Sequence, residues 1–454
     1  MKLIFTTLTL TFALILSARA QSPEAIREII RENSNYSIST VTTYQNVPIG
    51  KIASAPKGYK PFYFSMVARH GSRYELKDTT FLYTTEIFNR AAKLGILTKE
   101  GERVREILNR ATAEQRGKEG ELTSLGQVQW RGIGRRAYQN FGQLFDGGSV
   151  EAKSSTKMRC VFSMVAFLEG LKERNTKIFV EQEARESFLP MLRPMMDHPD
   201  SPKKLMHECR DYARYGAWRG EFAKEIERKH NFAPTLAKLV TRPELLTKEC
   251  GAASHFWFLY QTHHLLLFSQ NFGFDNYDII RRIYSVEDEY HFYCYHASVW
   301  VHMNWGWGND NAAIFTSYMR PLIDDVLGKA QEAVDGKNPN IANLRFTHDS
   351  YIVPLTTILG LEGCAATYNS DIERAVTSAP LCKVCPMGAN VQIVLYRDKG
   401  GKVLVRLLLN EKDATLPIEC ESAPFYPWEM FRNLVEGNMT KMEQKRNALI
   451  GKNH

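Results

Sequence analysis

After its first twenty residues, the sequence has no apolar run long enough to cross a bilayer. The opening stretch, MKLIFTTLTLTFALILSARA, has one lysine, an apolar segment and the small-residue pattern Ala18-Arg19-Ala20. This build is typical of a secretory signal peptide with an A-x-A cleavage site, and its apolar run is short for a membrane helix. We therefore expect residues 1–20 to be removed. The rest should be an exported protein without a membrane span, either periplasmic or extracellular.

The sequence also has little excess charge of either sign. There are 58 Lys+Arg against 50 Asp+Glu, and leaving out Lys2 and Arg19 lowers the formal charge from +8 to +6. This balance falls well short of the composition of a nucleic-acid-binding protein. A small positive excess suits an acidic small substrate if it is concentrated in a cleft, although an ordinary solvated surface explains it equally well.

Metal-binding patterns are scarce. Only one C-x-x-C occurs among the eight cysteines, at Cys382 and Cys385, and no second one completes a zinc site. An even number of cysteines in an exported protein permits disulfides, but spacing does not fix their pairing. Six histidines of the middle region have no accompanying carboxylate pair, so we expect them to pack or to form hydrogen bonds: His255, His263, His264, His291, His296 and His302. We expect no metal and no cofactor.

Short runs rich in β-branched and aromatic residues predict five strands, at 61–68, 177–181, 343–347, 391–397 and 402–409. Apolar residues at helical spacing predict helices between them, over 123–145, 157–174 and 350–361, the last with Pro354 in its first turn. Residues 186–334 have helical patterns with dense aromatic residues. Strands that flank a helical middle indicate an α/β core with an inserted helical cap. We expect the core to comprise 21–185 and 335–454, and the cap 186–334.

Arg69-His70-Gly71-Ser72-Arg73 directly follows the first predicted strand. Such a loop lies at the carboxyl end of a sheet, where α/β folds place their ligands. Gly71 permits a turn or a close approach of the backbone to a ligand. Arginines offer planar donors for phosphate or carboxylate, and a neutral histidine is a nucleophile. Taken alone, the motif is also compatible with a surface loop that carries scattered basic residues.

Two further segments supply matching chemistry. Another predicted strand ends in His348-Asp349, and Arg159 lies near the start of the predicted 157–174 helix, whose N-terminus favours anions. Phosphoryl transfer needs positive charge around the transferred group and a proton for the departing oxygen. Arg159 and His348 can help to stabilise the charge of the transferred group, and Asp349 can supply the proton. The arginines Arg185 and Arg193 and the lysines Lys203 and Lys204 would reach peripheral phosphates, although as solvated charges they need no explanation.

These motifs, in this order, resemble the histidine acid phosphatases. The likeness extends over about residues 60–410, and it is greatest to the multiple inositol polyphosphate phosphatase branch. There SSTKMRCVFSMVAFLEGL (154–171) and GELTSLGQVQWRGIGRR (120–136) resemble characteristic segments. The resemblance implies a three-layer α/β sandwich of the phosphoglycerate mutase type, with a mixed central sheet and a helical cap. It further implies that His70 attacks phosphorus and forms a phosphohistidine, and that Asp349 protonates the leaving oxygen. Phosphate oxygens would be bound by Arg69, Arg73, Arg159 and His348, and no metal would be used.

Two positions depart from the family pattern. Glu75 stands where a proline is common, two residues after the second arginine, which implies a changed entrance to the site. The inositol polyphosphate branch usually has His-Ala-Glu at the late motif, whereas this chain has His348-Asp349-Ser350. The proton donor is therefore expected at 349, and which phosphate of a polyphosphate leaves first is in doubt.

The sequence thus predicts an exported phosphomonoesterase that hydrolyses inositol polyphosphates such as phytate, a small phosphorylated substrate. A general acid phosphatase or a sugar phosphatase, for example one that acts on glucose 1-phosphate, would use the same residues. A non-catalytic anion-binding protein would need neither His70 nor Asp349. A mutase-like phosphotransferase fits poorly with export, since its substrates are cytosolic.

Overall fold

A computed structural model describes residues 22–44, 52–193, 210–303, 310–365 and 372–450 of the chain. The expected signal peptide and Cys209 lie outside these ranges. Within the described residues, no helix is both long and apolar enough to cross a membrane.

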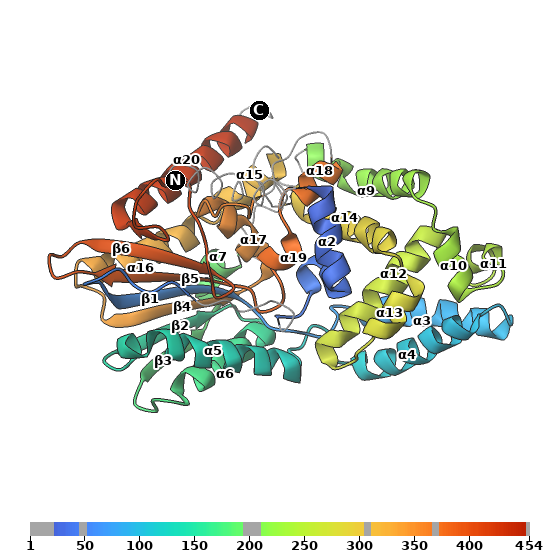
Figure 1. Cartoon of the computed structure of the whole chain (residues 1–454), viewed down its shortest axis with the longest axis horizontal. Coiled ribbons are helices and arrows are strands. Elements are labelled where there is room, and N and C mark those ends of the chain that lie inside the picture. The colour runs from blue at the N-terminus through green and yellow to red at the C-terminus, as the bar shows by residue number, and fades with distance from the viewer. Residues whose placement is uncertain (1–21, 45–51, 194–209, 304–309, 366–371, 451–454) are drawn as a thin grey trace, which may run out of the picture.

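The core is a mixed sheet of eight strands in the order β3-β2-β4-β1-β5-β6-β7, with β8 paired to β6 (Figure 1). Neighbours from β3 to β1 run parallel, and those from β1 through β5 and β6 to β7 and β8 run antiparallel. The strands are β1 Lys60–Arg69, β2 Ser149–Ser154, β3 Phe179–Ala184, β4 Asn340–Thr347, β5 Asn390–Arg397, β6 Val403–Leu409, β7 Lys412–Asp413 and β8 Phe425–Pro427. The expected α/β fold with a mixed central sheet is confirmed.

Helices cover both faces of the sheet. In Figure 1, α5 (Ser124–Phe145) and α6 (Met158–Lys172) lie below it, and α16 (Arg320–Val334), α17 (Asp349–Ile358) and α20 (Trp428–Ile450) lie above it. Side chains of β1 alternate between the two layers, as the pleat requires. Phe64 and Met66 join the core between the sheet and the helices α5 and α6, whereas Tyr63 and Val67 join the core on the opposite face.

The cap forms the other half of the molecule, on the right of Figure 1. Its helices are α9 Arg210–Lys229, α10 Ala233–Leu239, α11 Glu244–Lys248, α12 His255–Phe268, α13 Tyr277–Ile283 and α14 Val286–Met303, with the 3₁₀ helix η4 Ser269–Phe272. Earlier segments pack against them: α2 Pro23–Glu32, η1 Ser34–Val41, α3 Asp78–Lys93 and α4 Lys99–Gln115. The division of the chain at 186 and 334 stays a prediction.

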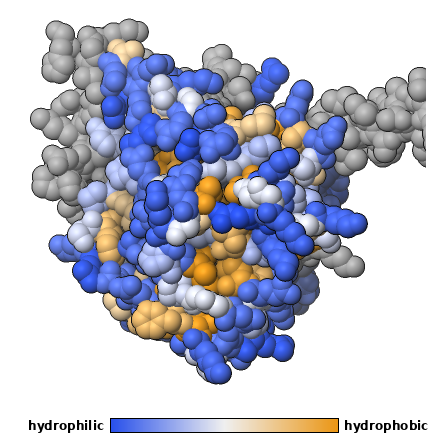
Figure 2. Space-filling view, turned by 90° about the vertical axis from the view of Figure 1, so that its left-hand side faces the viewer, coloured by the Kyte–Doolittle hydropathy of each residue, from blue (hydrophilic) through white to orange (hydrophobic). Residues whose placement is uncertain are grey.

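The described part of the chain also contains five short elements: η3 Glu186–Phe188, α7 Leu189–Leu192, α15 Asp310–Ser317, α18 Ile372–Thr377 and α19 Leu381–Val384. The face of the molecule at the sheet end, away from the cap, is mostly hydrophilic around a small apolar area (Figure 2).

Three of the differences between the sequence expectations and the structure have a clear physical reason. Strand β2, with the sequence SVEAKS, was not predicted, because only small or single apolar residues mark its alternation. Strand β3 extends over Phe179–Ala184 rather than 177–181, since parallel pairing with β2 defines its extent. Pro354 lies in the second turn of α17, not the first, where it removes one helical hydrogen bond.

Candidate active site

The two histidine motifs meet because β1 and β4 are adjacent parallel strands. Their registers place Arg69 opposite Thr347, so His70 and His348 leave the sheet side by side. The backbone N–H of His70 donates to the Thr347 carbonyl at 3.1 Å, and the two imidazole rings are 5.6 Å apart between centroids. The expected juxtaposition of these two strand ends at the carboxyl edge of the sheet is thus present.

Gly71 is required by a close packing contact with α5. A β-carbon at this position would lie 2.7 Å from the Gly126 carbonyl oxygen, and one on Gly126 would lie 2.3 Å from the Ser72 carbonyl oxygen. The loop is fixed further by Ser163 Oγ, which accepts from the Gly71 N–H at 3.0 Å, and by Gln129, which accepts from the Ser72 N–H at 2.9 Å. The close approach at Gly71 is therefore to helix α5, whereas the sequence predicts a turn or an approach to a ligand.

Substituting Gly71 by alanine is expected to lower the free energy of unfolding by about 1–3 kcal/mol, because the added methyl group overpacks the contact with α5. Thermal unfolding and phosphatase activity measure the change, and both should decrease. Gly328→Ala is the matched control, since a β-carbon there meets no atom within 4 Å and the residue lies inside α16. Equal stability of the Gly71 variant and the wild type would contradict this account.

Arg69 is fully buried and connects several segments of the chain. Its Nη2 donates to Asp349 Oδ2 at 2.6 Å, and its Nη1 donates to the carbonyl of Cys385 at 2.9 Å and to that of Thr40. Its Nε has no hydrogen-bond partner among the described residues. Arg69 therefore holds Asp349 in place and keeps one buried donor unused.

His70 is buried, with 2 % of its surface exposed. Its Nδ1 lies 2.9 Å from the backbone carbonyl oxygen of the next residue, Gly71. A carbonyl only accepts, so Nδ1 carries the proton and Nε2 keeps its lone pair. The pKa of His70 is well below its usual 6.5, mainly because of burial and then because of the charges of Arg159 and Arg69. The imidazole is therefore neutral over the physiological pH range.

The remaining predicted site residues surround this imidazole. Arg73 is buried, and Arg159 lies in the first turn of α6; burial lowers the pKa of both guanidinium groups. His348 is the N-cap residue of α17, and its Nε2 lies 3.3 Å from Ser155 Oγ. Burial, followed by the charge of Arg159, lowers the pKa of His348 to about 3. All six residues predicted from the sequence are brought into one cluster.

Asp349 is the carboxylate of this cluster. Burial raises its pKa, but the charges of Arg69 and then Arg73 act in the opposite direction, so that the net shift is downward. The N–H of Ser350 also donates to Asp349 Oδ1, at 2.8 Å. The ligand-free site thus holds an ionised carboxylate beside three guanidinium groups.

Sequence reasoning undervalued Arg193, which follows α7. It is buried rather than solvated, and its charge lowers the pKa of His348. The interpretation of Arg193 as a solvated charge is wrong, because the chain after β3 returns to the C-terminal end of β4, where the Thr347 hydroxyl donates to the Leu192 carbonyl. The lysines Lys203 and Lys204 lie outside the described residues.

Cys382 and Cys385 are buried, and neither forms a disulfide. Burial raises the pKa of both thiols to about 12, so they are neutral. The contribution of Cys385 to the cluster is its backbone carbonyl, which accepts from Arg69. Within the described ranges, no three His, Cys, Asp or Glu side chains are arranged as a metal site.

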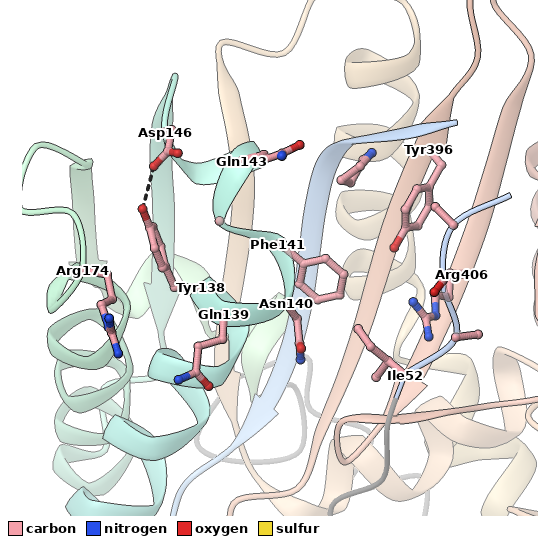
Figure 3. A pocket seen from close by; sticks show the side chains of 15 residues that line it. Ile52, Tyr138, Gln139, Asn140, Phe141, Gln143, Asp146, Arg174, Tyr396 and Arg406 are labelled. Atoms are coloured by element: carbon pink, nitrogen blue, oxygen red, sulfur yellow. Dashed lines mark hydrogen bonds between the residues drawn. The ribbon is translucent and has the colours of Figure 1, made fainter. Parts of the chain in front are cut away.

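A cavity of about 790 Å³ lies at the opposite end of the sheet (Figure 3). Its lining includes Pro61 at the start of β1, Tyr396 and Arg406, together with Tyr138, whose hydroxyl donates to Asp146 at 2.7 Å. Since β1 rises about 3.3 Å per residue, this cavity is about 26 Å along the strand from Arg69. None of the six cluster residues lines it.

Comparisons with known proteins agree with this geometry. The family model described as histidine phosphatase superfamily (branch 2) matches residues 63–410, a span that includes all six cluster residues. The chain therefore belongs to the histidine phosphatase superfamily, branch 2, and is a phosphatase. A comparison with curated protein sequences found no match.

Solved structures share the fold at low sequence identity. The Bifidobacterium longum multiple inositol polyphosphate phosphatase, in complex with inositol hexasulfate, is 18% identical at a TM-score of 0.66, covering 89% of this chain and 98% of that one. Its apo form gives 19% identity and a TM-score of 0.68, covering 87% and 96%. A phytase from D. castellii is 14% identical at a TM-score of 0.60, covering 89% and 85%.

Proposed function

We propose that the protein is an exported phosphomonoesterase that hydrolyses inositol polyphosphates through a phosphohistidine at His70. One observation carries the proposal: a neutral, buried imidazole with a free Nε2 lies among three guanidinium groups, with the Asp349 carboxyl beside them. An anion-binding site alone would need neither a nucleophile nor a proton donor.

Substrate binding is assigned to Arg69, Arg73, Arg159 and His348. Guanidinium groups donate in a planar fork that matches phosphate oxygens, and in a buried site these bonds are stronger than in water. The unpartnered Nε atoms of Arg69 and Arg159 are consistent with this role, because a bound phosphate would supply acceptors. The same donors would stabilise charge on the equatorial oxygens during transfer.

In the first step, His70 Nε2 attacks phosphorus and the bond from phosphorus to the ester oxygen breaks. The electron pair of that bond stays on the departing oxygen, which takes a proton from Asp349. In the second step, a water molecule attacks phosphorus and gives a proton to the Asp349 carboxylate, and the phosphorus–nitrogen bond breaks. Inorganic phosphate leaves, and both side chains return to their initial state.

Asp349 must be protonated to act as an acid, although Arg69 favours its ionised form in the empty site. A bound phosphate dianion opposes this effect, because it partly neutralises the arginines and adds a like charge next to the carboxylate. Substrate binding would therefore raise the pKa of Asp349, and acidic conditions would favour turnover.

Two observations favour inositol polyphosphates as substrates. The segment 154–171 resembles the multiple inositol polyphosphate phosphatase branch, and the chain shares its fold with solved structures of such enzymes. The structural neighbour from Bifidobacterium longum carries inositol hexasulfate, and another neighbour is a phytase. Export is proposed from residues 1–20, together with removal of that segment. A general acid phosphatase or a sugar phosphatase remains the second candidate, since it would use the same six residues.

The test of substrate class is phosphate release from phytate and from glucose 1-phosphate, measured side by side at mildly acidic pH, with His70→Ala as the control. A preference for phytate that depends on His70 would support the proposal. A preference for glucose 1-phosphate would retain the mechanism and replace the substrate. Release that does not depend on His70 would contradict the mechanism.

Activity towards p-nitrophenyl phosphate is expected to stay constant as the pH falls from about 7 to about 5. His70 and His348 stay neutral in this range because their pKa values are lowered, and p-nitrophenolate leaves without a proton from Asp349. The measurement is kcat/KM against pH. A decrease with a midpoint near the ordinary histidine pKa of 6.5 would contradict the neutral nucleophile. The folded state opposes protonation of these histidines, so the free energy of unfolding should decrease as the pH is lowered below about 6.5. This loss of stability limits how far the pH can be lowered in the assay.

A further inference from the structure

A second group of basic side chains lies in the cap, on helices α9, α12 and α14 (Figure 1). The rings of His264 on α12 and His296 on α14 are 5.3 Å apart between centroids. Arg219 on α9 lies over the ring of Tyr295, next to His296, with its guanidinium carbon 4.6 Å from the ring centroid. The ring of Tyr260 lies 4.9 Å from that of Tyr295 and 6.0 Å from that of His264, so the three groups share one location. In keeping with this, the charge of Arg219 lowers the pKa of both histidines, after the dominant effect of burial.

This cap cluster, Arg219, His264 and His296, continues directly from the candidate active site. Phe268 joins the two: His264 stacks on its ring at 5.8 Å, and the Arg73 guanidinium lies over the same ring at 5.7 Å. The charge of Arg69 lowers the pKa of His296, and that of Arg73 lowers the pKa of His264, although burial is the larger cause in both cases. Only one aromatic ring therefore separates the cap cluster from a predicted phosphate-binding arginine.

The cap cluster has donors that the protein itself leaves unused. Within the described part of the chain, arginine Nε atoms that are buried and without a hydrogen-bond partner occur at Arg69, Arg159 and Arg219. The first two belong to the candidate active site. His264 and His296 each have a buried Nδ1 without a partner as well. Buried polar nitrogens normally have partners, so this concentration indicates a ligand that supplies acceptors.

Buried arginines that are structural look different. Arg345 and Arg406 donate to Asp325 and Asp413 at 2.5 and 2.6 Å, respectively. Among the described residues, no carboxylate pairs with Arg219. The three residues of the cap cluster are half-buried, although their unpartnered nitrogens are themselves buried. Glu75, which lies 3.8 Å from Arg73, opposes the effect of burial on His264, although the pKa of His264 remains lowered, to about 4.

We propose that Arg219, His264 and His296 form a second anion subsite, which binds a phosphate group of the substrate other than the one attacked by His70. The inference rests on the proposed function and assigns residues of the cap that would distinguish an ester with at least two phosphates on one compact scaffold from a monophosphate ester. A monophosphate ester would leave the subsite empty. Arg219 supplies the fixed positive charge, and the imidazoles supply hydrogen-bond donors.

The test measures inhibition of p-nitrophenyl phosphate hydrolysis by inositol hexakissulfate, which carries several anionic groups and is not a phosphate ester. Arg219→Met is expected to raise the inhibition constant by about ten- to a hundredfold, as loss of a charge-assisted hydrogen bond does. This effect should exceed the change in KM for p-nitrophenyl phosphate by at least about tenfold. Arg228→Met is the matched control, because Arg228 is exposed on the same helix and the substitution removes the same charge.

Two further variants keep the test decisive if Arg219→Met folds poorly. Arg219→Lys retains the charge, so inositol hexakissulfate should inhibit this variant nearly as strongly as it inhibits the wild type. His264→Phe keeps the stacking on Phe268, removes the imidazole donors and should weaken inhibition in the same direction. Thermal unfolding establishes that each variant is folded.

An inhibition constant that is the same for Arg219→Met and wild type would overturn the subsite. So would equal losses for the inhibitor and for p-nitrophenyl phosphate, because Arg219 would then act through the catalytic cluster. If wild type hydrolyses p-nitrophenyl phosphate through His70 but leaves phytate intact, the proposed substrate fails. The dependence of inhibition on Arg219 still decides the subsite, because inhibitor binding requires no turnover.

Discussion

Substitution of His70 by alanine is expected to lower kcat/KM for p-nitrophenyl phosphate by about 10⁴-fold or more. The variant loses the atom that attacks phosphorus, and the arginines that remain can bind the ester but cannot form the intermediate. Removal of a nucleophile is among the most damaging changes to an enzyme that works through a covalent step. Binding of inorganic phosphate should be affected far less, because the guanidinium groups are retained.

The measurement combines steady-state kinetics with a search for the intermediate. Wild-type enzyme that is mixed rapidly with substrate and quenched in base should carry a phosphoryl group on the peptide that contains His70, since phosphohistidine is stable in base and labile in acid. His255→Ala serves as the control, because His255 lies in the cap, where its Nε2 is 3.0 Å from the Pro243 carbonyl oxygen. A phosphoryl group on another residue, or full activity of His70→Ala, would exclude the proposed mechanism.

Asp349→Asn is expected to have an effect that depends on the leaving group. Phytate and glucose 1-phosphate release alkoxides, which need a proton, so kcat should fall by about 10²- to 10⁴-fold. p-Nitrophenolate is a stable anion and leaves without protonation, so its formation should fall much less. The contrast between the two substrate types is a direct readout of proton donation.

Asparagine keeps the shape of the side chain but removes the charge that faces Arg69. Arg69 is fully buried, so the variant should also lose stability, and thermal unfolding must accompany the kinetics. Asp398→Asn in the turn between β5 and β6 is a suitable control, since its carboxylate oxygen accepts from the Lys402 N–H and an amide oxygen can do the same. Equal losses with both leaving groups would indicate that Asp349 acts through Arg69 and not as an acid.

The local chemistry of the site could be predicted from the sequence because each motif is a continuous segment at the end of a strand. The runs PFYFSMVA and NLRFT are short and apolar, and the polar residues that follow must lie at strand ends. The N-terminal position of Arg159 in α6 follows in the same way from helical periodicity. These inferences depend on chain neighbours alone, which explains why the predicted residues and the observed cluster coincide.

The strand β2 and the role of Arg193 could not be predicted in this way. The sequence SVEAKS has weak alternation, and it is a strand because β3 and β4 flank it in the sheet. Arg193 lies in a segment that looks like surface, and only the return of the chain to the C-terminal end of β4 buries it. Both outcomes depend on partners that are distant along the chain.

The residue types at the strand ends, and hence the class of reaction, follow from short segments of the sequence. The neighbouring positions of β1 and β4, the contact of Arg69 with Asp349 across 280 positions, and the proximity of Arg219, His264 and His296 to Arg73 follow from the folded chain alone. The physical reason is that backbone propensity and side-chain chemistry are properties of short segments. Contacts between distant segments, in contrast, depend on the order and register of strands and on the packing of helices, which no single segment encodes.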